Sequence, residues 1–268
     1  MQDWDIEVQR RDSDRWYMER PHFHEGFELL LPLTCGGNIF IDRQAWPLRR
    51  GLLFLIDSSA PHRSFSRRRC AYSRYVLHFS QEALEEENAL SVAERLSGGS
   101  RGVELGRENF ERCLRLFEEL DQHKTDTAGT LHRRSAFLGI LALICDLWTG
   151  DPSSLLPENP PDAVAAAAIG YIRANLGRHL TLDELAGECL MSKSTLCHRF
   201  KEATGFSVGE YITHCRVLRA RALLRRGVSV QEAGERAGFG SNAHFIRTFK
   251  RLTGASPGQY AKTADLER

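Results

Sequence analysis

One segment of the sequence occurs twice near the C-terminal end, and this repeat restricts the possible folds more than any other feature. Residues 200–211 and 249–260 share the pattern Phe-Lys-x-x-Thr-Gly-x-Ser-x-Gly-x-Tyr, which gives seven identities in twelve positions. A pattern of this length that returns in the same chain predicts two copies of one supersecondary unit.

Each copy is preceded by signals for a short helix and a break. Thr181-Leu-Asp-Glu184 and Ser229-Val-Gln-Glu232 match the S/T-x-x-E capping box, in which a hydroxyl and a carboxylate satisfy free backbone amides at a helix start. The helical pattern then stops at Leu190-Met191 in the first copy and at Gly238-Phe239-Gly240 in the second. A tight turn is therefore predicted after each short helix.

A second helix is predicted after each turn, over Ser192–Thr204 and Ser241–Thr253. Gly205 and Gly254 follow these helices and are expected to end them as left-handed C-caps. Helix, tight turn and helix form a helix-turn-helix, which places its second helix in the major groove of DNA. The two units are predicted at about residues 181–204 and 229–253.

The second helices have one apolar face and one face suited to reading bases. Apolar residues four positions apart are expected to anchor each helix to its domain, and they are Leu196 with Phe200 and Phe245 with Phe249. The opposite faces are expected to contact DNA through Lys193, Ser194, Cys197, His198, Asn242, Ala243, Ile246 and Arg247. Arg247 can donate two hydrogen bonds to guanine, Asn242 can bridge an adenine edge, and Ile246 or Ala243 can meet a thymine methyl group.

A long helix over Tyr211–Arg226 is predicted to join the two units. A rigid connector could hold the two reading helices about one DNA turn, ~34 Å, apart. Several of its arginines are expected to contact phosphate groups, which position a protein on DNA without reading sequence. The charge distribution agrees, because residues 162–268 hold 16 Lys and Arg against 10 Asp and Glu, and residues 1–161 hold 20 against 25. The C-terminal part is thus expected to bind a polyanion.

The N-terminal part has a different pattern. Short apolar runs broken by Gly, Pro, Asn and Asp predict strands, with candidates at Phe27–Leu31, Asn38–Ile41, Leu52–Ile56 and Tyr72–Phe79. Helices are predicted at Glu108–Lys124 and Leu131–Trp148, and their apolar surface could both cover the strands and form a dimer interface. Four prolines between Thr149 and Pro161 predict a linker.

We therefore expect an α+β protein of two domains. The N-terminal domain is an antiparallel β-sandwich or barrel with added helices, and the C-terminal domain is all-α with two helix-turn-helix units. The expected boundaries are 1–80 for the strands, 81–149 for the helical part with possible dimerisation, 150–161 for the linker and 162–268 for the DNA-binding domain.

The C-terminal region, about 105 residues, resembles the paired helix-turn-helix domain of the AraC/XylS transcription regulators, most closely over Gly238–Lys250. The resemblance implies a DNA-binding regulator that responds to a small molecule, possibly a sugar. Two positions depart from the family pattern. Cys197-His198 replaces a frequent Ser-Arg or Gln-Arg pair, and Gly234 replaces a usual alanine.

His22, His24, Glu28 and His62, with Gly51 eleven residues before His62, resemble the two motifs of cupin barrels, which regulators of this kind often carry as the effector sensor. The resemblance implies a double-stranded β-helix in which these four residues line the effector site. Metal-dependent cupins use corresponding residues as metal ligands, so a metal-dependent enzyme or metal sensor fused to a DNA-binding domain is the alternative.

No nucleophile triad, phosphate loop or acid pair in the sequence suggests other chemistry, so we expect a protein that is not an enzyme and needs no cofactor or metal. The start of the chain lacks a signal peptide, and no apolar run is long enough to span a membrane, which predicts a cytoplasmic protein. The expected partners are double-stranded DNA, a small-molecule effector, a second copy of the chain and RNA polymerase. Activation and repression are equally compatible with the sequence.

Overall fold

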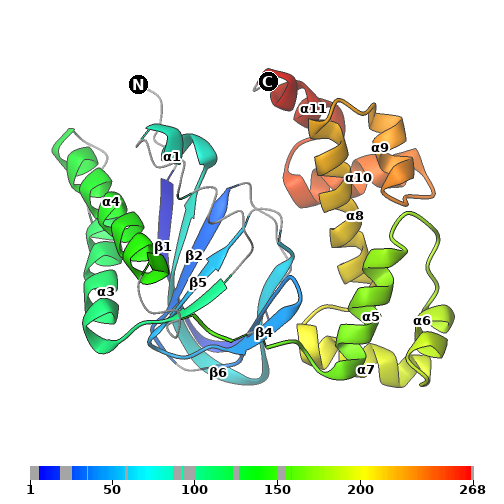
Figure 1. Cartoon of the computed structure of the whole chain (residues 1–268), viewed down its shortest axis with the longest axis horizontal. Helices are drawn as coiled ribbons and strands as arrows, with labels where there is room; N and C mark the ends of the chain where they lie inside the picture. The colour runs from blue at the N-terminus through cyan, green and yellow to red at the C-terminus, as the bar shows by residue number, and fades with distance from the viewer. Residues whose placement is uncertain are drawn as a thin grey trace. The chain divides into compact units, whose positions relative to one another are not determined.

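The computed structural model of the chain describes residues 6–18, 26–34, 36–57, 60–86, 92, 101–122, 127–149, 155–157 and 159–266. The chain forms two compact units (Figure 1). Nearly all of the first unit lies before Pro160, and the second is built mainly from Pro160–Arg268. Among the described residues, no helix combines the length and the apolar character that crossing a membrane requires.

The first unit contains one antiparallel sheet. Its strands are β1 (Ile6–Met18), β2 (Phe27–Pro32), β3 (Asn38–Ile41), β4 (Gln44–Pro47), β5 (Leu52–Ile56), β6 (His62–Phe79) and β7 (Arg101–Glu104). The order is β4-β3-β6-β2-β5-β7, and β1 also pairs with β6. Strand β6 is 18 residues long and pairs with β1, β2 and β3, so it connects most of the sheet.

The strands agree with the sequence prediction in part. β3 and β5 have the predicted bounds, β2 is one residue longer, and the predicted strand Tyr72–Phe79 is the end of β6. The prediction missed β1, β4 and β7, and β7 lies within residues 81–149, the part expected to carry the helices. It also expected a closed barrel. The described strands instead form an open series, in which β4 and β7 end the path without pairing to each other.

Both faces of the sheet are covered by apolar side chains. Alternate residues of β2, β5 and β6, including Leu29, Leu55 and Leu77, pack against the helices α3 (Arg107–Gln122) and α4 (Thr127–Thr149). Figure 1 shows these two helices side by side on one face of the sheet. The alternating residues on the other face form a second cluster that includes Leu30 and Phe54. A short helix, α1 (Gln81–Glu86), follows β6.

The second unit is helical over its described residues. Its elements are α5 (Ala163–Ala174), α6 (Leu182–Glu188), α7 (Lys193–Thr204), α8 (Val208–Arg225), α9 (Val230–Arg236), α10 (Asn242–Thr253) and α11 (Pro257–Leu266). The long helix α8 contacts α7 in the first half and α9, α10 and α11 in the second (Figure 1). The two repeats thus correspond to the helix pairs α6–α7 and α9–α10.

The helix starts follow from capping residues. Thr181 and Ser229 accept a hydrogen bond from the third backbone amide of α6 and α9, as predicted. The carboxylate of Glu184 also pairs with Arg178, and that of Glu232 pairs with Arg236. Reciprocal capping pairs form at the start of α8 and α11, and they are Ser207 with Glu210 and Ser256 with Gln259.

Candidate nucleic-acid interface and effector site

Helix α7 presents the predicted reading face to solvent. Leu196 and Phe200 are fully buried and fix the helix to its neighbours, as expected from their spacing. On the outward side, Lys193, Ser194 and His198 are exposed and Cys197 is half-buried. The helix starts at its N-cap Ser192 and ends at Gly205, whose φ of 77° is left-handed as predicted.

Helix α10 has the same arrangement. Phe245 and Phe249 are fully buried, and the helix ends at Gly254 with a φ of 81°. The four predicted reading residues are all exposed, and they are Asn242, Ala243, Ile246 and Arg247. Ile246 keeps 38% of its surface exposed, which is unusual for a large apolar side chain and suits contact with a base methyl group.

The two helices differ in whether their basic side chains have carboxylate neighbours. On α7, Lys193 Nζ lies 2.8 Å from Asp183, and His198 Nδ1 lies 3.5 Å from Glu202. Within the described part of the chain, Arg247 of α10 forms no ion pair. Because exposed pairs of this kind contribute about 1 kcal/mol or less, they do not prevent Lys193 from moving to a phosphate group. Arg247 needs no such exchange of partners.

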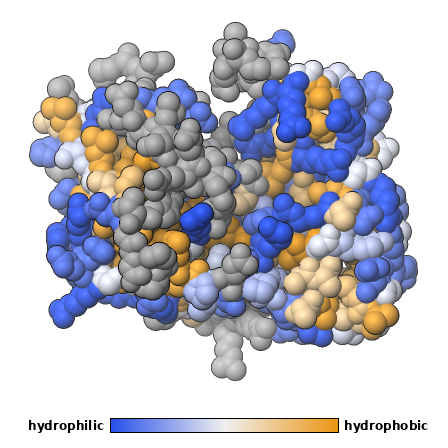
Figure 2. Space-filling view, viewed as in Figure 1, coloured by the Kyte–Doolittle hydropathy of each residue, from blue (hydrophilic) through white to orange (hydrophobic). Residues whose placement is uncertain are grey.

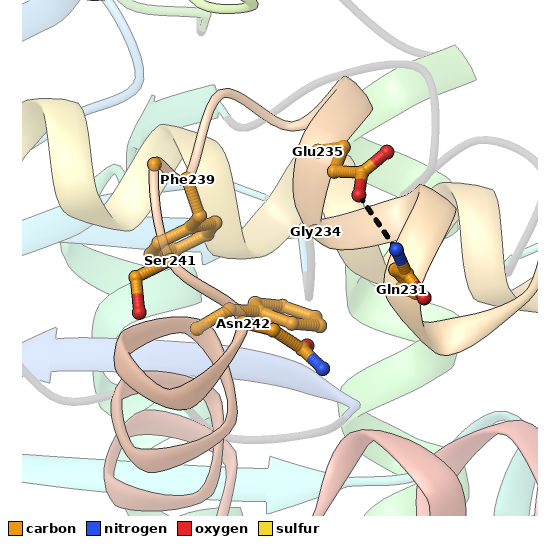
Figure 3. Close-up of a pocket in the computed structure, with 8 residues that line it drawn as sticks. Gln231, Gly234, Glu235, Phe239, Ser241 and Asn242 are labelled. Atoms are coloured by element: carbon orange, nitrogen blue, oxygen red, sulfur yellow. Dashed lines mark hydrogen bonds between the residues drawn. The ribbon is translucent and has the colours of Figure 1, made fainter.

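A small pocket lies in the turn between α9 and α10 (Figure 3). Its volume is about 80 Å³, and its lining includes Gln231, Glu235, Phe239 and Asn242. Gln231 Nε2 donates a hydrogen bond of 3.0 Å to Glu235. Gly234 also lines the pocket, and a Cβ atom there would lie 2.7 Å from Cδ1 of the Phe245 ring. The close ring explains why glycine occupies the position at which the family pattern commonly has alanine.

The turns of the two helix pairs use the same left-handed backbone with different residues. Gly238 has a φ of 95° in the second turn, where glycine adopts this conformation without steric cost. Leu190 has a φ of 53° in the first turn and is 92% exposed. A leucine in this region is strained by about 1–2 kcal/mol.

The first unit brings two of the four predicted effector-site residues together. Glu28 on β2 and His62 at the start of β6 are both buried, and His62 Nε2 lies 3.4 Å from Glu28 Oε2. His22 and His24 lie outside the described residues. The prediction missed His78, whose Nε2 lies 3.1 Å from the same Glu28 oxygen. His78 reaches it because Glu28 and His78 are register partners on β2 and β6.

The electrostatics of this cluster follow from its burial. Burial acts to lower the pKa of His62, but the charge and hydrogen bond of Glu28 and the carbonyl group of Ala60, 3.0 Å from Nδ1, outweigh it, so the pKa is raised. Arg74 is fully buried on the same face of β6, with its guanidinium 4.7 Å from the centre of the Tyr72 ring. Burial, with the charge of Arg11, lowers the pKa of Arg74 to about 10.

The cluster thus offers polar groups inside a mainly apolar sheet, a combination found in small-molecule sites. Among the described side chains, no three His, Cys, Asp or Glu residues are grouped so that they could hold a metal ion.

Comparison with known proteins gives a family for the C-terminal unit. Residues 185–263 match the model of a helix-turn-helix domain, which includes most of α6, all of α7–α10 and part of α11. A protein named as an AraC-like transcription regulator, from Streptomyces antibioticus, is 34% identical over 102 residues, which cover 38% of this chain and 34% of the relative. The transcriptional activator RhaS of Klebsiella pneumoniae is 29% identical over 136 residues, 50% of this chain and 47% of the relative.

These two matches span between a third and a half of the relatives' lengths. The transcriptional activator RhaR of Shigella dysenteriae is similar over 246 residues at 21% identity, 89% of this chain and 86% of the relative. Among solved structures, the DNA-binding domain of AdpA in complex with a target DNA is 30% identical, with a TM-score of 0.38, and covers 39% of this chain and 95% of that chain. The C-terminal region therefore contains a helix-turn-helix domain and is similar to AraC-like transcription regulators.

Proposed function

We propose that the chain is a sequence-specific DNA-binding transcription regulator that carries two helix-turn-helix units, α6–α7 and α9–α10. The observation that carries this proposal is the repeated geometry of α7 and α10. Each helix is anchored by buried apolar residues and presents an exposed polar face at its N-terminal end. This is the surface that a recognition helix inserts into the major groove.

The reading residues have different roles in the proposal. On α10, Arg247 is directed to guanine, Asn242 to adenine and Ile246 to a thymine methyl group, because their side chains match the groups that those bases present in the major groove. On α7, Lys193, Ser194, Cys197 and His198 form the corresponding surface. Since Lys193 and His198 already have carboxylate neighbours, α7 is proposed to contribute less affinity than α10.

The first unit is proposed to be the sensor for a small polar effector, with a sugar as one candidate. The supporting observation is that the buried His62 and the half-buried His78 both lie within 3.4 Å of the buried carboxylate of Glu28. The predicted cupin-like architecture is part of this proposal, supported by the antiparallel strands and by the proximity of Glu28 to His62. An effector that exchanges hydrogen bonds with this cluster could change the sheet without entering the DNA-binding unit.

A homodimer through α4 is also proposed. The outward residues Ala128, Leu131, Ser135, Leu138 and Ala142 follow the 3-4 spacing of a coiled-coil seam. Leu131 is 66% exposed and Leu138 is 40% exposed, and Figure 2 shows apolar surface over this helix. Replacing both leucines with glutamate is expected to convert a dimer to a monomer in sedimentation velocity. A monomeric parent protein would contradict this part of the proposal. Contact with RNA polymerase stays a prediction.

Selection of bound sequences from a random DNA pool, with the full-length protein, tests the main proposal. A motif of two short elements about one helical turn, ~10 bp, apart is the expected result. Arg247→Ala should then weaken binding by about 1–3 kcal/mol and relax the preference at one base pair. Arg251→Ala removes the same charge from the last turn of α10 and is the control. Equal losses on every sequence for both variants would contradict base reading by Arg247.

A further inference from the structure

The two halves of the second unit are joined by α8 along the chain, and they also contact each other directly beside the middle of this helix. Arg216, on α8, donates a hydrogen bond of 3.3 Å from Nε to the carbonyl oxygen of Leu176 and one of 2.8 Å from Nη2 to that of Arg178. Both carbonyl groups belong to the segment that follows α5 and leads into α6. Arg216 therefore ties the connecting helix to the backbone of the first half.

The second half reaches the same point through Gly238, in the turn after α9. A Cβ atom on Gly238 would lie 2.0 Å from the carbonyl oxygen of Leu176 and 3.0 Å from Arg216 Nε. The backbone of the second turn thus packs directly on the carbonyl group that Arg216 binds. Three segments meet there: the segment after α5, the middle of α8 and the α9–α10 turn.

We infer that Arg216 and Gly238 set the spacing between the two DNA elements that one copy of the chain can read. This inference rests on the proposed DNA-binding function. Helix α8 joins α7 to α10 along the chain, and each helix pair also packs against it. The junction at Leu176 adds a second path, and two connections fix both the separation and the relative rotation of the reading helices.

If the separation and rotation of the two reading helices are fixed, the protein should bind best to DNA in which the two elements have one matching spacing. One inserted base pair moves the second DNA element by about 3.4 Å and turns it by about a tenth of a turn around the DNA axis. A rigid protein cannot follow that rotation without losing base contacts in one element. Since each lost base contact costs about tenfold in affinity or more, the parent protein should prefer one spacing by at least that factor.

The test measures binding of the full chain to a series of DNA duplexes that carry the selected motif with its spacing shortened or lengthened by one and two base pairs. Arg216→Gln removes the guanidinium group and its positive charge. Arg216→Lys keeps the charge but cannot donate both hydrogen bonds in the geometry of a guanidinium group. Gly238→Ala pushes the second turn away from Leu176. Arg226→Gln is the matched control, because it removes one positive charge from the exposed end of α8.

The expected result is a flatter spacing profile for Arg216→Gln, with the tenfold preference reduced to about threefold or less, an intermediate profile for Arg216→Lys and a shifted optimum for Gly238→Ala. The control should lose affinity equally at all spacings. If Arg216→Gln keeps the parent profile or shows only the uniform loss of the control, the inference is wrong while the proposed function stands. If the parent protein binds none of the duplexes, the proposed function itself fails, and the inference with it.

Discussion

Gly234, in the middle of α9, provides a direct test of how the second helix pair is packed. Replacing it with alanine favours the helix by about 1 kcal/mol, because glycine is the poorer helix former. The new methyl group, however, would lie 2.7 Å from Cδ1 and 3.0 Å from Cγ of the Phe245 ring. Phe245 is fully buried, with the Phe239 and Phe249 rings centred 5.0 and 5.5 Å away, so it cannot easily move aside.

Overpacking of this kind costs about 1–3 kcal/mol, which exceeds the gain in helix propensity. We therefore expect Gly234→Ala to destabilise the α9–α10 pair by roughly 1 kcal/mol, within a range of about 0–2 kcal/mol. Gly187→Ala is the control. It lies in α6 of the other repeat with no atom within 4 Å of its added methyl group, so it should gain up to about 1 kcal/mol.

Hydrogen exchange of the backbone amides in α6, α9 and α10 suits this comparison, because it reports the free energy of local opening in each helix. Tryptophan fluorescence would not report the change in stability of α9 and α10, because the four tryptophans all precede residue 149. If Gly234→Ala protects α9 as strongly as Gly187→Ala protects α6, Phe245 has room to move. The packing explanation for the glycine would then be wrong.

Three further perturbations test separate features of the second unit. Leu190→Gly should stabilise it by up to about 1 kcal/mol in thermal unfolding, because it removes the strain of a left-handed leucine, and a loss of stability would contradict that assignment. Asp183→Asn should free Lys193 for phosphate and steepen the dependence of log affinity on log salt by about one, whereas the control Glu188→Gln should leave the slope unchanged. Hydrogen bonds from arginine and tyrosine neighbours lower the pKa of Glu184 from 4.5 to about 2, so its stabilising contribution should be complete above pH 4.5 and disappear as the pH falls through 2. An acid titration followed by circular dichroism should show this loss in the parent protein and not in Glu184→Gln.

The elements of the second unit could be predicted closely because local chemistry determines them. Ser192 and Ser241 cap α7 and α10, and Gly205 and Gly254 end them, so each boundary is encoded within a few residues. The reading faces follow from the position of the apolar anchors. The junction at Leu176 could not be predicted in this way, because it joins carbonyl groups to Arg216 across 40 residues of sequence.

The first unit was harder to predict because its contacts depend on strand pairing. β1 contains many charged residues, and its apolar residues lie at its two ends, so the sequence does not indicate a strand until β6 pairs with it. The role of His78 depends on the register that places it opposite Glu28. In the sequence alone, His78 is one of several polar residues in its strand, and nothing nearby indicates its partner.

The segment between the two units is attached to the sheet almost up to the second unit. Leu156 donates a backbone hydrogen bond of 2.8 Å to Gly102 of β7, and Trp46 Nε1 donates one of 3.2 Å to the carbonyl oxygen of Pro157. Asp162 caps α5, so four residues of chain lie between Pro157 and the first cap of the second unit, and two of them are prolines. Four residues span at most about 14 Å, so the connection to the second unit is short, and its two prolines restrict its backbone conformations. The sheet edge at β7 and the first helix of the second unit are thus separated by only a few residues of chain, which is the covalent route by which a change at that edge would reach α5.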